Sequence, residues 1–239
     1  MRPVDKGQSP YITVASYQDA EPYLEDRLGK YCSYCEMRIN NQLAVEHKES
    51  KNSGGSLSDW DNLLLSCSYC NARKKEKIKK GEAGKWLWPD RDNTFLAFTY
   101  KKGVPALAEE VLKAVSQDAY EKAKSLFEGI ALDYRPGMTE SQVEQKKYAD
   151  KRWMVRHETL SVAEESRDIW EKCEDQESKE IQIYNIVSQA KGYGFFSVWM
   201  EVFAGVTEVR KALIEAFPGT AKNCFDENGE PVRRSGGIL

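Results

Sequence analysis

The sequence has little of what marks membrane, secreted or uniformly basic proteins. Its apolar runs are only a few residues long, too short to cross a membrane. Arg2 and Lys6 near the N-terminus are not followed by the apolar segment of a signal peptide. The 35 Lys and Arg are outnumbered by 38 Asp and Glu, and the net charge of −3 excludes a wholly basic surface without excluding a local basic site. We therefore expect a cytoplasmic protein that does not associate with membranes.

Six cysteines are present, and four of them form two Cys-x-x-Cys pairs. In a reducing compartment such cysteines are metal ligands or free thiols rather than disulfides. A two-residue gap lets both sulfurs of a pair face one ion, and two pairs complete a closed tetrahedral zinc site. We predict a structural Zn²⁺ bound by Cys32, Cys35, Cys67 and Cys70; four free thiols with accidental spacing are the alternative. Cys173 and Cys224 have no such spacing and are expected to be structural or free.

Between and beside these pairs lie the polar residues that phosphodiester hydrolysis requires. His47, one of only two histidines, is a base for activating water near neutral pH. Glu46 offers a hard oxygen ligand for Mg²⁺ or Mn²⁺, and Asn71 offers an amide oxygen near a helix N-terminus. The alternative is that Glu46-His47 is a surface dipeptide. His157 lacks such neighbours and is expected to be structural.

A basic run follows the second cysteine pair. Between Arg73 and Lys85 seven basic residues face only Glu76 and Glu82. Such a run predicts sequence-independent contacts with a phosphate backbone, and a solvated helix face is the alternative.

The pattern along the chain predicts short elements first and helices later. A helix over 17–28 is expected to begin after Ser16 and end at Gly29, followed by short strands at 43–45 and 63–65. Asn71 is expected to open a basic helix that Gly81 ends, and the polar tail from Gly219 is expected to be mobile. Further helices are predicted over 106–115, 118–130, 140–173, 179–191, 195–203 and 208–217.

The order Cys-x-x-Cys, Val-Glu-His, Trp-x-Asn-Leu-Leu-Leu, Cys-x-x-Cys-Asn-x-x-Lys resembles the HNH endonuclease family. The resemblance covers about 45 residues and implies a ββα-metal unit beside a four-cysteine zinc site. It implies His47 as general base and Glu46 and Asn71 as ligands of the catalytic metal. Asn62 would fasten the intervening loop by backbone hydrogen bonds. Many members carry proline three residues after the histidine, where this chain has Ser50.

By the same resemblance Lys74 would approach a phosphate. With its neighbours in the basic run, it completes the nucleic-acid-binding set that we expect: Arg73, Lys74 and Lys75.

A narrower resemblance is to PtuB-type HNH nucleases of Septu and retron anti-phage systems. It rests on the short arm with Arg2-Pro3, the early motif block, the later Trp-Pro segment and the long helical remainder. It implies an ABC/SMC-like ATPase partner of the PtuA type. Because the chain has no G-x-x-x-x-G-K loop, nucleotide control would come from such a partner.

The expected fold is therefore α+β: a small ββα-metal unit with a four-cysteine zinc site, followed by a mostly α-helical region. We expect an N-terminal arm with a short helix (1–30), a nuclease domain (31–100) and a helical, partner-docking region (101–239). The expected activity is divalent-metal-dependent cleavage of nucleic acid, with DNA favoured and RNA second.

A zinc-stabilised binding or adaptor module without catalysis is the alternative. It does not require His47, Asn62 and Asn71 together. A zinc-thiol redox protein is disfavoured, because the two pairs flank short strands without a thioredoxin-like pattern.

Overall fold

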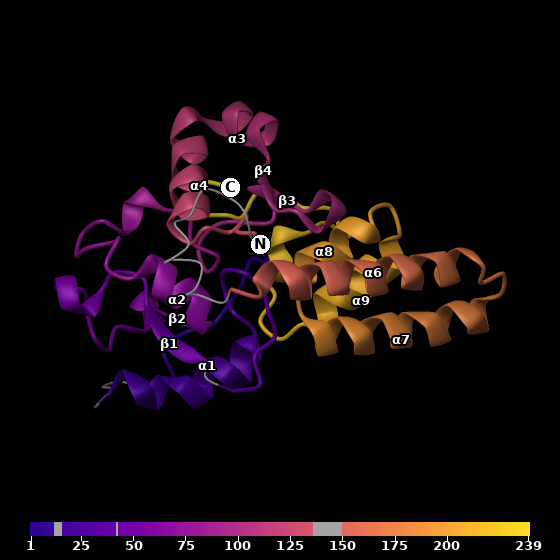
Figure 1. The fold of residues 1–239 in the computed structure, drawn as a ribbon, viewed down its shortest axis with the longest axis horizontal. Helices are drawn as coiled ribbons and strands as arrows, with labels where there is room; N and C mark the ends of the chain where they lie inside the picture. Colours follow the sequence, from indigo (N-terminus) through magenta and orange to yellow (C-terminus); the bar gives the residue numbers. More distant parts are fainter. Residues whose placement is uncertain (12–15, 42, 136–149) are drawn as a thin grey trace.

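The computed structural model describes residues 1–11, 16–41, 43–135 and 150–239. Within them, strands β1 and β2 with helices α1 to α4 form one part, and helices α6 to α9 form an elongated helical part beside it (Figure 1). The predicted α+β class is confirmed. None of the described helices is both long and apolar enough to cross a membrane.

The ββα unit forms where the sequence predicts it. Strand β1 (Ala44–His47) pairs antiparallel with β2 (Leu63–Ser66), and His47 lies opposite Leu63. All four residues of β2 are buried, which explains its unbroken apolar run. Because β1 runs through Glu46 and His47, both side chains are held by a paired strand.

Helix α2 (Ser68–Lys74) follows β2 directly, and its boundaries differ from the prediction. It begins three residues earlier than expected because the Cys67 sulfur accepts the Cys70 N–H and so caps the helix. It ends at Lys74 because Lys75 has φ 46°. Asn71 therefore lies in the middle of the helix.

The N-terminal helical segment agrees with the prediction. A short 3-10 turn (Tyr17–Ala20) begins at Ser16, whose side chain accepts a backbone N–H, and continues as α1 (Glu21–Leu28). Pro22 lies in the first turn of α1, where no helical hydrogen bond is lost, and Gly29 ends the helix with φ 71°.

A second small sheet joins the two parts. Strand β3 (Phe98–Thr99) pairs with β4 (Ala106–Leu107), so the helix predicted from residue 106 begins only at α3 (Glu109–Val115). Helix α4 (Gln117–Gly129) packs against the buried Trp86; a Cβ at Gly129 would lie 2.2 Å from the indole. The two tryptophans of the Trp-Leu-Trp-Pro segment are core residues.

The helical part consists of α6 (Arg152–Glu171), α7 (Gln176–Tyr193), α8 (Phe196–Val202) and α9 (Thr207–Ala216). Residues 140–149 of a predicted helix lie outside the described residues. The apolar side chains at α8 could form either the helical core or a partner interface by sequence alone. They are buried in the core, with only Val202 partly exposed: Phe195, Phe196, Val198, Trp199, Val202 and Phe203. Helices α6 and α7 form an antiparallel arm that extends from the body (Figure 1).

The prediction of a mobile tail is wrong. The Leu239 side chain is fully buried, and its carbonyl accepts the Asn93 N–H at 3.1 Å. Arg234 donates to the Val4 carbonyl at 2.9 Å. Composition alone suggested mobility, but Phe225 and Leu239 find apolar neighbours that only the folded chain supplies.

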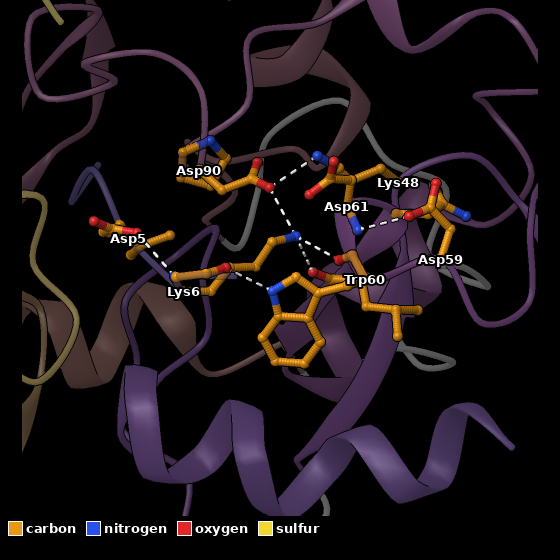
Figure 2. A network of polar contacts seen from close by, with 12 residues as sticks. Asp5, Lys6, Lys48, Asp59, Trp60, Asp61 and Asp90 are labelled. Atoms are coloured by element: carbon orange, nitrogen blue, oxygen red, sulfur yellow. Dashed lines mark hydrogen bonds and ion pairs between the residues drawn. The ribbon is translucent and has the colours of Figure 1, made fainter. Parts of the chain in front are cut away.

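A buried ionic network fastens the N-terminal arm to the ββα unit (Figure 2). The Asp90 carboxylate lies 2.9 Å from the Lys6 ammonium and 2.8 Å from that of Lys48, and all three side chains are at most 8% exposed. Lys6 also donates to the carbonyls of Trp60 and Leu63, at the start of β2. One carboxylate therefore neutralises two cations that connect three segments.

Removing that carboxylate should destabilise the whole fold. Asp90→Asn leaves two buried ammonium groups without a counter-charge, and we expect the free energy of unfolding to fall by about 3–5 kcal/mol. Chemical denaturation at neutral pH measures it. Asp61→Asn, at an exposed carboxyl of the same region, should change it by less than about 1 kcal/mol. Equal effects of the two substitutions would contradict this assignment.

The effect of Asp90→Asn on stability should also depend on pH. Burial alone would raise the pKa of Asp90, but Lys6 and Lys48 outweigh it and hold the pKa below its usual 3.8. A lowered carboxyl pKa gives stability that is complete above the unfolded-state value and lost as the pH falls through the native one. The difference between wild type and Asp90→Asn should therefore shrink below pH 3.8.

Candidate active site and zinc centre

The four cysteines of the two pairs come together as predicted. Their sulfurs all lie within 4.8 Å of one another, and those of Cys35 and Cys67 are 3.7 Å apart. A tetrahedral zinc with bonds of about 2.3 Å places its sulfurs about 3.8 Å apart. The cluster is buried, and its soft, closed donor set fits a structural Zn²⁺.

A buried arginine connects this cluster to the helical part. Nη1 of Arg152, the first residue of α6, lies 3.3 Å from the Cys70 sulfur. The other donors of the guanidinium bind Asp150 and the carbonyls of Ile130 and Ala131, so all five N–H groups have acceptors. A metal-bound thiolate would make the contact with Cys70 charge-assisted.

The proposed catalytic residues line a groove of about 880 Å³. Its floor is β1 with the residue before it, and the 3-10 turn Lys51–Ser53 closes one end. One wall carries Tyr17, Gln18 and Glu21, and the other carries residues of α2 and Lys75. The structure thus brings together Glu46, His47 and Asn71, which are up to 25 positions apart in the chain.

The orientation of His47 leaves one ring nitrogen available as a base. Its Nε2 lies 3.1 Å from the Leu57 carbonyl oxygen. Since a carbonyl only accepts, this contact assigns the proton of the neutral ring to Nε2 and leaves Nδ1 as the acceptor. Burial lowers the pKa of His47, with a smaller opposing effect of the Leu57 carbonyl. The Tyr17 ring meets the imidazole edge-on at 5.0 Å.

Glu46 is held on both carboxylate oxygens. Oε1 lies 2.8 Å from the Lys74 ammonium, and Oε2 accepts the Tyr34 hydroxyl at 2.5 Å. Burial raises the pKa of Glu46, although Lys74 and Tyr34 oppose the shift. Lys74 also donates to the His47 carbonyl at 2.7 Å. The lysine therefore joins α2 to both candidate catalytic positions of β1.

This arrangement changes the interpretation of Lys74. Its side chain is fully buried, so the predicted phosphate contact is not available to it in this structure. Arg73 is also turned inward: its guanidinium lies over the Tyr134 ring at 4.6 Å and 3.8 Å from Asp150. Of the three predicted nucleic-acid-binding residues, Lys75 is the one whose side chain is exposed and lines the groove.

The groove offers oxygen donors for a divalent ion. The carboxylate of Glu46 has about four lone-pair positions and the two hydrogen bonds use two of them. Asn71 is exposed and adds an amide oxygen. Within the described ranges, the cysteine cluster is the only group of three or more His, Cys, Asp or Glu ligands. Two protein oxygens fit Mg²⁺ or Mn²⁺ held largely by water and substrate oxygens.

Asn62 lies outside the groove and fastens the loop behind it. Its side-chain oxygen accepts the Glu49 N–H at 2.8 Å, and its amide donates to the carbonyls of Glu49 and Ser56. This is the loop-fastening geometry that the resemblance implies. The nearby Ser50 donates its N–H to the Ile78 carbonyl at 2.8 Å, a bond that proline at this position would lose.

Two residues at this site were not found from the sequence. Lys51 is exposed at the closed end of the groove, and its ammonium lies 4.3 Å above the Tyr17 ring. Its position four residues after His47 was the one available signal. Tyr17 had no signal, because nothing local places residue 17 beside residue 47.

Comparison with known proteins supports a nuclease. A family model described as HNH endonuclease matches residues 32–77, which include both cysteine pairs, Glu46, His47, Asn62 and Asn71. Neither curated proteins nor solved structures show a significant match to the chain. The chain thus contains an HNH endonuclease domain, with a cysteine cluster suited to zinc and a mostly helical region after it.

The contact between Arg152 and Cys70 predicts a measurable effect on metal binding. Arg152→Met should weaken zinc affinity by about 10–100-fold, because ligand orientation depends on such neighbours. Competition with a chromophoric chelator measures it, and Arg152→Lys should lie in between. Arg167→Met, on the same helix but paired with Glu171, is the matched control. Unchanged zinc affinity in Arg152→Met would show that α6 does not support the metal site.

Proposed function

We propose that the protein is a divalent-metal-dependent HNH endonuclease that hydrolyses phosphodiester bonds of nucleic acid, with DNA the favoured substrate and RNA the second. The observation that carries the proposal is the convergence of Glu46, His47 and Asn71 on one groove, within the segment that matches the HNH endonuclease family.

The chemistry follows from the orientation of these side chains. Nδ1 of His47 takes the proton of a water molecule, and the hydroxide attacks phosphorus opposite the leaving oxygen. The Leu57 carbonyl fixes the ring, and burial keeps it neutral and able to accept the proton. Glu46 and Asn71 would hold Mg²⁺ or Mn²⁺, which supplies charge stabilisation at the leaving oxygen.

A non-catalytic, zinc-stabilised nucleic-acid-binding or adaptor module is the second candidate. One observation favours it: both oxygens of Glu46 are engaged by Lys74 and Tyr34 within the protein. The orientation of His47 favours the nuclease, because a binding module has no need of an imidazole with a free Nδ1 in a groove.

We assign phosphate binding to a basic rim beside the groove. The rim consists of four exposed lysines from two adjoining loops: Lys51, Lys75, Lys79 and Lys80. The loops are joined by the bonds from Ser50 N–H to the Ile78 carbonyl and from Lys80 N–H to the Ser53 carbonyl. Such a rim gives salt-dependent binding without base specificity.

We further propose that the helical region (101–239) docks an ATPase subunit of the PtuA type in a cytoplasmic anti-phage complex. Its support is the PtuB resemblance and the character of the α6–α7 arm. Residues 158–180 carry nine acidic and three basic side chains, and Ile169, Ile181 and Tyr184 are more than half exposed on the same arm. Acidic charge disfavours nucleic acid on this arm, and exposed apolar side chains favour a protein contact.

Removing the proposed base tests catalysis directly. His47→Ala should lower the cleavage rate at least about 100-fold in Mg²⁺ or Mn²⁺, because a positioned base contributes that much or more. Zinc content should stay at the wild-type level. His157→Ala, an exposed histidine on α6, is the matched control and should cleave normally. Wild-type cleavage by His47→Ala would refute this base.

The adjacent lysines at the end of α2, Lys74 and Lys75, should respond differently to substitution. Lys75→Met should weaken binding to nucleic acid and reduce the slope of log K against log salt by about 1, because one phosphate contact is lost. Lys74→Met should instead lower the free energy of unfolding by about 3–5 kcal/mol, because Glu46 loses its buried partner. Salt titrations and chemical denaturation of both variants check this, and a lowered salt slope without destabilisation in Lys74→Met would reverse the assignment.

A further inference from the structure

We infer that the groove takes a strand that is unpaired at the scissile phosphate, so that single strands, loops and ends are substrates in preference to intact duplex. The inference rests on the proposed function, since it names the substrate class of the same site. Three observations carry it: the depth of the catalytic residues, the unequal charge of the two walls, and an aromatic ring beside His47.

The catalytic side chains lie deep between the walls. Glu46 is 4% exposed and His47 is 6% exposed, and both lie at the floor of the groove. A phosphate must therefore enter between the Tyr17 wall and the α2 wall to meet the base. An unpaired backbone can bend into such a groove, whereas a paired one brings its complementary strand with it.

The two walls carry opposite charge. Three lysines of the basic rim follow α2, and Lys51 lies on the adjoining 3-10 turn between β1 and β2. Glu76 is the one acidic side chain that lines the groove on this side, so the side is basic in balance. On the other side, residues 16–28 hold four acidic side chains and one basic: Asp19, Glu21, Glu25, Asp26 and Arg27. The Arg27 guanidinium is turned away to the carbonyls of Lys6 and Gln8 and does not offset them. The Lys30 ammonium lies 3.4 Å from Glu25 and offsets that one carboxylate only.

This asymmetry discriminates between one and two phosphate backbones. A single strand can follow the basic rim and keep its charge away from the acidic wall. A duplex centred on the groove presents a backbone to each wall and is repelled at one of them. Glu21 lines the groove itself, and Glu25 lies one helical turn further on the same face.

Tyr17 adds a contact that only an unpaired base can use. Its ring is half-buried beside the imidazole of His47, and its hydroxyl accepts a hydrogen bond from the Lys51 ammonium at 3.0 Å. Lys51 is exposed on a flexible side chain, so its ammonium can move to an entering phosphate and release the ring face. An unpaired base can stack on that face, but a base inside a duplex already stacks on its neighbours.

Strand preference is measured first as binding, which needs no catalysis. Full-length His47→Ala protein is titrated by fluorescence anisotropy with labelled single-stranded DNA, single-stranded RNA, the corresponding duplexes, and a hairpin with an unpaired loop. We expect single strands and the looped hairpin to bind about tenfold or more tightly than duplex. The DNA and RNA arms identify which nucleic acid supplies the strand. Equal affinity for single strand and duplex would overturn the inference.

Substitutions in the wall that carries Tyr17, Glu21 and Glu25 test what causes the strand preference. In the same background Tyr17→Leu should lose about tenfold in single-strand affinity and little in duplex affinity, and Tyr17→Phe should lose less because it keeps the ring. The double variant Glu21→Lys, Glu25→Lys should bind duplex more tightly than the unsubstituted wall does. The control is Glu164→Lys, Glu165→Lys, which makes the same charge change on the remote α6–α7 arm, and its gain in duplex affinity should be several-fold smaller. An equal gain in both pairs would exclude a role for the acidic wall.

Cleavage assays distinguish a failure of the strand preference from a failure of the proposed nuclease activity. Wild-type protein in Mn²⁺ should cut the single strands and the unpaired loop faster than the duplex, by a factor comparable to the binding preference. Equal cutting of single strand and duplex that disappears in His47→Ala would leave the nuclease intact and overturn the strand preference. A binding preference without any His47-dependent cleavage would support the unpaired-strand site and contradict the nuclease.

Discussion

Four cysteine sulfurs within 4.8 Å of one another are the constraint on which the rest of this structure depends. The first pair fixes the turn before β1, and the second pair ends β2 and caps α2 through Cys67. Through Arg152 the cluster also fixes the start of α6. The proposed catalytic groove and the helical region are therefore connected through one cysteine cluster suited to zinc, in a segment whose strands are only four residues long. Strands this short cannot hold a sheet together by their own hydrogen bonds, and a zinc ion bound by the cysteine cluster would supply the missing stability.

Buried cations do most of the remaining cross-linking. Lys6 and Lys48 converge on Asp90, Lys74 joins Glu46 to the His47 backbone, and Arg152 saturates its five donors. Each brings a positive charge out of water and is stabilised by a carboxylate, and all but Lys48 also donate to backbone carbonyls. Lys74, which the sequence predicts to bind nucleic acid, thus becomes an internal connection. The surface that remains basic is smaller and lies on the two loops beside the groove.

The parts of the molecule to which we assign different functions also differ in charge. Basic side chains border one side of the proposed catalytic groove, acidic side chains border the other, and the α6–α7 arm is strongly acidic with exposed apolar residues. A nucleic acid that enters the groove is therefore attracted along the basic side only. The net charge of −3 hides this arrangement, because opposite local charges cancel in the sum.

Spacing along the chain was sufficient to predict the cysteine cluster and the ββα unit, and it singled out Glu46, His47 and Asn71, which the structure brings to one groove. These features depend on local chemistry: two residues between the cysteines of each pair and a short apolar strand beside each pair. The helix boundaries of α2 needed the structure, because a cysteine sulfur served as its cap. The buried tail needed it as well, because its apolar residues pack against loops more than a hundred positions away.

The sequence by itself determined which residues are available for metal binding and hydrolysis, because ligand type and spacing are properties of a short segment. Tertiary structure decided which charged side chains face solvent and which face one another. It buried Lys74 and turned Arg73 inward, and it placed Tyr17 and Lys51 beside His47. The physical reason is that the burial of a charge depends on partners distant in sequence, and no local pattern records where those partners will lie.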